Sequence, residues 1–65
     1  MKNLVKVERA RLDLTQAQLA EKLGVSRQTI HAIEKEKFNP SVTLALKMGR
    51  LFKLSVEELF MMEED

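Results

Sequence analysis

The chain has 65 residues, with one histidine and no cysteine. That length allows one domain with a single small core, too little to enclose a catalytic cleft with its supporting residues. Without cysteine there is no disulfide and no thiolate metal site, and a lone histidine has no partner for a metal centre or a catalytic triad. We therefore expect neither an enzyme nor a metal- or cofactor-binding protein.

Membrane insertion and export are not indicated. No apolar run approaches the ~20 residues that a spanning helix needs, and no signal-peptide cleavage site follows the N-terminal lysines. The sequence thus predicts a soluble, cytoplasmic protein with no membrane partner.

Charge is unevenly distributed along the chain, although the formal net charge is only +1. Residues 1–53 contain all 11 lysines and arginines and five acids, a net charge of +6, whereas residues 54–65 contain five acids and no base. A basic body suits phosphate binding, and DNA would repel the acidic end, which we expect to point away from it. The acidic end could equally do no more than keep a small protein soluble.

The first helix is predicted over residues 3–12, with Val5, Arg9 and Leu12 on one face. An arginine on that face places the helix at the margin of the core. We expect Arg9 to extend its charged head to the surface or to pair with an acid such as Glu34.

Two short helices joined by a tight turn are predicted within residues 15–34. Thr15 is a good N-cap, and Gln18 three residues later completes a capping box. Gly24 can adopt the left-handed conformation that often ends a helix, and Ser26 then caps a second helix. Two helices with such a turn form a helix-turn-helix.

The second of these helices has one apolar and one polar face. Ile30 and Ile33 have the i, i+3 spacing of an inward face. Arg and Gln side chains can make bidentate hydrogen bonds to guanine and adenine in the major groove, and recognition helices contact bases through their first turn. The side chains left on the outward face are Arg27, Gln28, Thr29 and His31.

A loop is predicted over residues 35–41, because Asn39-Pro40-Ser41 is a turn signal before a new helix. Lys35, Lys37 and Asn39 directly follow the predicted recognition helix, where side chains can reach the phosphate backbone. We favour phosphate contact over a merely solvated loop, since both location and composition point to it.

Two further helices complete the pattern. The strongest helical spacing in the chain begins at Ser41 or Val42 and predicts a central packing helix. Ser55 and Glu58 form another capping box, which begins a short fifth helix through Phe60. The apolar positions of the fourth helix are Leu44, Ala45, Met48, Leu51 and Phe52.

Phe60, Met61 and Met62 form an apolar group that a small monomer would find hard to bury. Methionine often fills gaps in ordinary cores, so closure of the bundle is the alternative. We expect these residues to form a homodimer interface on the side made by residues 41–65, partly because helix-turn-helix proteins usually read two half-sites as dimers.

A family resemblance is carried by residues from Leu14 to Glu34, followed by Asn39-Pro40-Ser41 and by residues 54–60. The sequence resembles the XRE/Cro-type helix-turn-helix family, most closely its small stand-alone bacterial regulators. The resemblance covers nearly the whole chain, and its ordered set of caps, turn glycine and aliphatic positions is specific. It implies an all-α, five-helix lambda-repressor-like bundle in a single domain, residues 1–65, with the helix-turn-helix at about 15–34.

The resemblance also implies roles outside base reading. Gln16 is similar to the family glutamine that fixes its helix to a phosphate and braces the recognition helix. Glu34 is similar to the family glutamate that pairs with an arginine of the first helix, here Arg9. Ser26 resembles a cap that can also meet phosphate. The predicted phosphate-binding residues are therefore Gln16, Ser26, Lys35, Lys37 and Asn39.

Five residues are predicted to read bases. Arg27 and Gln28 resemble the principal base-reading positions of the family, and Thr29 and His31 lie where further groove contacts are made. Ala32 occupies a position that is polar in many relatives and can offer only a methyl contact, for instance to thymine.

Together these features predict a sequence-specific double-stranded DNA-binding transcriptional regulator, a repressor that binds a palindromic operator as a homodimer. Occupying an operator blocks polymerase without chemistry. A DNA-binding antitoxin or accessory subunit would use the same surface and stays an alternative. A protein-interaction module of the same fold would be expected to lose the cationic and amide side chains that this third helix keeps. No small-molecule effector is inferred.

Overall fold

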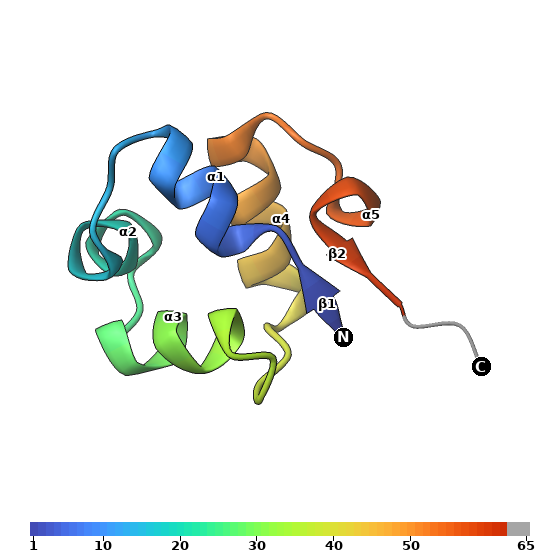
Figure 1. Cartoon of the computed structure of the whole chain (residues 1–65), viewed down its shortest axis with the longest axis horizontal. Coiled ribbons are helices and arrows are strands. Elements are labelled where there is room, and N and C mark those ends of the chain that lie inside the picture. Colours follow the sequence, from blue (N-terminus) through green and yellow to red (C-terminus); the bar gives the residue numbers. More distant parts are fainter. Residues whose placement is uncertain (63–65) are drawn as a thin grey trace.

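Within residues 1–62, five helices enclose one apolar core, and residues near the two ends of the chain meet in a short antiparallel ladder (Figure 1). The computed structural model describes these residues, so the predicted acidic tail from Glu63 to Asp65 lies outside them. None of the helices described is long and apolar enough to cross a bilayer. The elements are β1 (Lys2–Asn3), α1 (Val5–Arg11), α2 (Gln16–Leu23), α3 (Arg27–Glu34), α4 (Val42–Phe52), α5 (Val56–Leu59) and β2 (Phe60–Met61). The prediction of an all-α, five-helix bundle containing a helix-turn-helix is confirmed.

The core takes side chains from every helix, which fixes α3 against the rest of the molecule. Full burial of one large aliphatic or aromatic side chain contributes roughly 1.5–3 kcal/mol to folding. The largest fully buried side chains are Val5, Leu19, Ile30, Ile33, Met48, Phe52 and Leu59.

Four helices begin with a hydroxyl side chain that accepts a backbone hydrogen bond from the third helical residue, as the sequence predicts for three of them. This cap satisfies one of the amides that have no partner inside the helix. The reciprocal capping boxes at Thr15 and Ser55 are both formed. The capping residues are Thr15, Ser26, Ser41 and Ser55.

The end of α3 is held without a glycine. Glu36 has a φ of 63°, and its amide donates to the Ile33 carbonyl at 3.0 Å. The next amide, of Lys37, donates to the Ala32 carbonyl at 3.0 Å. This is the Schellman arrangement, which satisfies helix carbonyls and stops the helix sharply.

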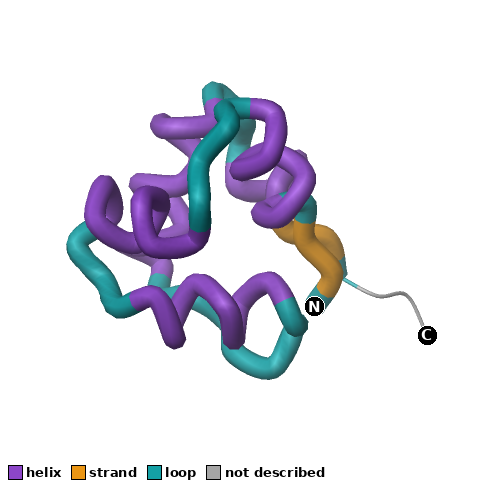
Figure 2. Tube along the Cα trace, turned by 60° about the vertical axis from the view of Figure 1, so that its left-hand side comes forward, coloured by secondary structure: helices purple, strands orange, loops and turns teal. Residues whose placement is uncertain are grey.

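Residues 2–3 form a strand rather than the start of the first helix. In the ladder Lys2 lies opposite Met61 and Asn3 lies opposite Phe60. The prediction of helix from residue 3, and of helical structure at Phe60, was therefore wrong. Pairing between segments so far apart in the chain leaves no periodic signal within a strand of two residues. Figures 1 and 2 place this ladder beside the C-terminal end of α3.

Phe60 lies in the core of its own chain, with 6% of its surface exposed. Its expected place in a dimer interface stays a prediction, and the small exposed part of its side chain limits the apolar area that it can add there. Met61 and Met62 are exposed by 38% and 85% and remain on the surface.

Candidate nucleic-acid interface

The turn between α2 and α3 sets the direction of α3. Gly24 adopts a φ of 73°, and the Val25 amide donates to the Ala20 carbonyl at 3.0 Å. Ile30 and Ile33 are fully buried against the core. The opposite side of α3 is consequently turned toward solvent along its length.

Three of the five predicted base-reading residues come together on that outward side. Arg27, Gln28 and His31 are exposed and line a shallow hollow of about 210 Å³. Thr29 is partly buried, and its hydroxyl lies 2.9 Å from that of Ser26. Ala32 is also partly buried and does not line the hollow.

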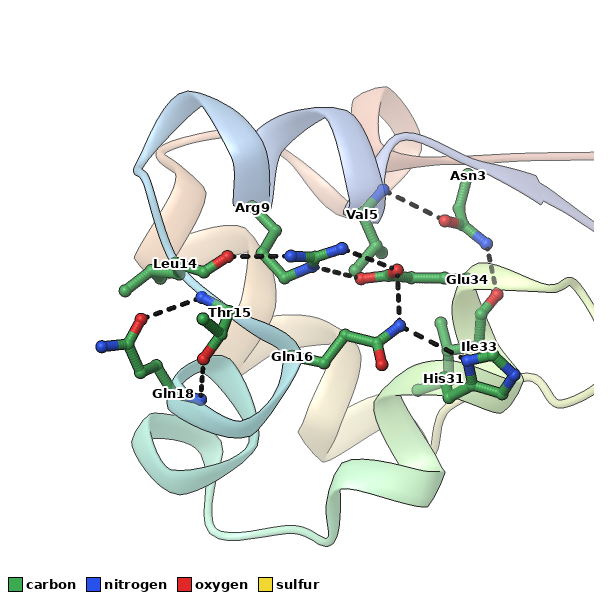
Figure 3. Close-up of polar contacts among 10 residues, drawn as sticks. All are labelled: Asn3, Val5, Arg9, Leu14, Thr15, Gln16, Gln18, His31, Ile33 and Glu34. Carbon is green, nitrogen blue, oxygen red and sulfur yellow. Dashed lines mark hydrogen bonds and ion pairs between the residues drawn. The ribbon is translucent and has the colours of Figure 1, made fainter.

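A forked ion pair fastens the C-terminal end of α3 to α1 (Figure 3). Arg9 Nε donates to Glu34 Oε2 at 2.7 Å, and Arg9 Nη2 donates to Glu34 Oε1 at 3.2 Å. Arg9 Nη1 also donates to the Leu14 carbonyl at 2.8 Å. The predicted pairing of Arg9 with Glu34 is present, and its position behind α3 gives it a structural role.

The surroundings of Glu34 keep it ionised. Burial alone would raise the pKa of Glu34, but hydrogen bonds from Arg9 and Gln16, together with the charges of Arg9 and Lys6, outweigh burial and lower the pKa below its usual range. The hydrogen bond to Glu34 in turn raises the pKa of Arg9. Both members of the pair therefore stay charged at neutral pH.

Gln16 connects the start of α2 to the same carboxylate. Its Nε2 donates to Glu34 Oε1 at 3.1 Å and lies 3.5 Å from His31 Nδ1 (Figure 3). Gln16 thus contacts two residues of α3, which is the bracing position that the family resemblance implies. An amide nitrogen so placed lies at the edge of the outward surface.

Lys6 is a cation that the sequence analysis did not assign to the interface. It lines a cleft of about 340 Å³ between α1, α2 and α3, together with Gln16, His31 and Lys35. Arg9 and Glu34 at this cleft neutralise each other. Among residues 1–62 the ammonium groups of Lys6 and Lys35 have no ion-pair partner, so the cleft carries a surplus of positive charge. The i, i+3 spacing of Lys6 and Arg9 on a helix is the signal that could have identified it.

The remaining predicted phosphate-binding residues do not line this cleft. Lys37 and Asn39 are exposed in the loop that follows α3, and Ser26 is exposed at its N-terminus. His31 lines both the cleft and the hollow beside Arg27. The polar surface is therefore continuous from the first turn of α3 to its end.

The part of the chain that the structure describes contains no cluster of metal ligands. No group of three or more histidine, cysteine, aspartate and glutamate side chains lies close enough there to hold a metal ion. The polar surface around α3 offers amide, guanidinium and ammonium donors, which suit base edges and phosphates.

A helix-turn-helix family model matches residues 5–59, the stretch from α1 through α5. The chain is 54% identical over 65 residues to an uncharacterised HTH-type transcriptional regulator of Methanocaldococcus jannaschii, covering all of this chain and 98% of that relative. It is 48% identical to the HTH-type transcriptional regulator YgzD of Bacillus subtilis, again covering all of this chain and 98% of the relative. A regulator of the same description from Archaeoglobus fulgidus is 42% identical over the whole chain and 92% of its own length.

Proposed function

The chain belongs to the XRE-type helix-turn-helix family, and from that premise we propose that it is a sequence-specific double-stranded DNA-binding transcriptional regulator. One observation carries the proposal. The outward face of α3 presents Arg27, Gln28 and His31 to solvent, while the opposite face is buried against the core. A helix held in this way can enter the major groove as a rigid body.

Base reading and phosphate binding fall to different residues. Arg27 and Gln28 have the donors that recognise guanine and adenine edges, and His31 extends the same surface. Thr29 and Ala32 add short contacts at its margin. Phosphates along the groove are bound by the cations, amides and hydroxyl around α3, namely Lys6, Gln16, Ser26, Lys35, Lys37 and Asn39. These contacts position the helix without conveying sequence.

Repression is the simplest output of such a protein. A domain bound over an operator excludes polymerase by occupancy and needs no chemistry or effector. The site of action is the cytoplasm, where prokaryotic DNA lies.

A homodimer on a palindromic operator is the expected assembly, and an apolar surface away from α3 supports it. A groove of about 450 Å³ is lined by residues of α4, α5 and β2 and by residues near both ends of the described part of the chain, among them Val42, Leu46 and Met62. These three side chains are exposed by 77%, 53% and 85%. Contiguous apolar surface of this kind on a small domain typically marks an interaction site. None of its lining residues belongs to α3, so both surfaces can be occupied together.

Selection of bound fragments from random duplex DNA tests the proposal. We expect enrichment of one sequence with two inverted half-sites, centred about one helical turn or 10 base pairs apart, or a multiple of that spacing. Recovery of fragments with no common sequence would refute sequence-specific binding. Recovery of a single unrepeated site would refute the symmetric dimer alone.

A further inference from the structure

The last turn of α3 is held by three side chains from other elements. Arg9 and Gln16 hold the side chain of Glu34, whereas Asn3 holds the backbone. Asn3 Nδ2 donates to the Ile33 carbonyl at 2.9 Å (Figure 3). The same carbonyl accepts the Glu36 amide at 3.0 Å, so the Asn3 amide is its second donor and ties this turn to the N-terminal segment.

Asn3 is itself fixed on both sides. Its Oδ1 accepts a hydrogen bond from the Val5 amide at 3.0 Å, and its backbone pairs with Phe60 in the ladder. One amide orientation satisfies both contacts, because the flipped orientation would face oxygen to the Ile33 carbonyl and nitrogen to the Val5 amide. Asn3 thereby joins the ladder through its backbone to the start of α1 and the end of α3 through its side chain.

We propose that Asn3 is a positioning residue for DNA reading, an inference that rests on the proposed function. Ile33 lies six residues after Arg27, about 9 Å along the helix axis. Movement of the held end changes the angle of α3 to the domain, and this moves Arg27 and Gln28 relative to the bases. Asn3 thus sets base readout from a position that lies outside the base-reading surface.

The two classes of DNA contact respond differently to such a movement. Bidentate hydrogen bonds to base edges require defined geometry, whereas attraction to phosphates depends on charge and tolerates small displacements. Loss of the Asn3 contact should therefore weaken binding to the recognised sequence more than binding to random DNA. A purely stabilising role would lower both affinities equally, because it changes only the folded fraction.

The test compares the wild type with Asn3→Ser. Serine is neutral, and its hydroxyl can accept the Val5 amide two residues ahead, but it is too short to reach the Ile33 carbonyl. Kd is measured for the duplex that the wild type selects and for a random duplex of equal length. From the usual net value of one hydrogen bond, we expect roughly a three- to tenfold weaker Kd for the selected duplex. The Kd for the random duplex should not change.

Ser55→Ala is the matched control, because it removes the cap of α5 and leaves in place the three side chains that hold the last turn of α3. It should lower thermal stability and leave unchanged the ratio of the Kd for the random duplex to the Kd for the selected duplex. If Asn3→Ser does not fold, Asn3→Asp retains the acceptor for Val5, lacks the donor, and should reduce the same ratio. A ratio equal to that of the wild type in the folded variant overturns the inference. No preference for any duplex in the wild type would instead overturn the proposed function.

Discussion

Arg9 and Glu34 join α1 to the end of α3 through two nearly parallel hydrogen bonds, of 2.7 and 3.2 Å. The Glu34 side chain is only 4% exposed and that of Arg9 only 16%, so the pair is largely withdrawn from water. Removal of one partner leaves the other charge buried and poorly compensated, which costs more than the net stabilisation of the intact pair. The position of α3 consequently depends on both residues being present.

Arg9→Met should destabilise the fold by about 3 kcal/mol, the lower end of the cost of breaking a buried pair, because Arg9 retains some exposure. Urea unfolding followed by circular dichroism measures the change. Arg11→Met is the control, since it removes the pair with Glu8, in which Arg11 is 55% exposed, and a 3.3 Å hydrogen bond to the Phe52 carbonyl. That change should cost less than about 1 kcal/mol. Equal losses in the two variants would contradict the structural role of Arg9.

The stability contributed by the Glu34 carboxylate should depend on pH. Its pKa in the folded chain is lowered, so the folded state holds its proton less tightly than the unfolded state. The contribution is therefore complete above the unfolded pKa and disappears as pH falls through the folded pKa.

Comparison of the wild type with Glu34→Gln isolates that contribution from the other carboxyl groups. The difference between their free energies of unfolding should be largest near neutral pH and shrink as the solution is acidified below the ordinary range of a glutamate. A difference that stays constant from neutral to acidic pH would show that Glu34 does not titrate as its surroundings require.

Local patterns were sufficient to predict that these five helices form, although not the first residue of α1 or the last of α5, because caps and apolar spacing act within a few residues. Thr15, Ser26, Ser41 and Ser55 begin helices as their residue types indicate. The ladder between β1 and β2 cannot be predicted from such local patterns. A strand of two residues has no period, and its partner lies near the other end of the chain.

Lys6→Ala should weaken binding to every duplex and reduce the slope of log K against log salt by about one unit, because each phosphate contact releases about one counterion. Fluorescence titrations at several salt concentrations measure the slope. Lys47→Ala is the control, as it removes the same charge from α4, away from the cleft. A slope that falls equally in both variants would mean that Lys6 acts only through net charge.

If two copies of the chain associate through the apolar groove, a charge placed in the groove should weaken the dimer. Leu46→Lys should weaken dimerisation, because it places a charge on a surface that the partner is expected to cover, while leaving the monomer folded. Val7→Lys, at an equally exposed apolar position on α1, should not change the association. Sedimentation equilibrium at micromolar concentration distinguishes the two. A wild type that is monomeric both free and bound to DNA would refute the dimer.

As with the fold, some residues of the site can be predicted from local sequence patterns and others depend on tertiary packing. The outward position of Arg27 and Gln28 follows from the 3.6-residue period of a helix whose other face is apolar. The i, i+3 spacing places Lys6 on the same side of α1 as Arg9, but the position of that side next to α3, like the position of Asn3, depends on how α1 and the ladder pack. The burial of Phe60 likewise became evident only with the ladder in place.

The central claim is that the outward face of α3 reads bases. Its most direct test measures Kd of the wild type and of Gln28→Ala for the selected duplex and for all of its single-base substitutions. The wild type should discriminate by about 1–3 kcal/mol at the base pair that Gln28 contacts. Gln28→Ala should lose discrimination at that base pair alone and keep its affinity for random DNA. Unchanged discrimination at every position would show that the face formed by Arg27, Gln28 and His31 does not read DNA.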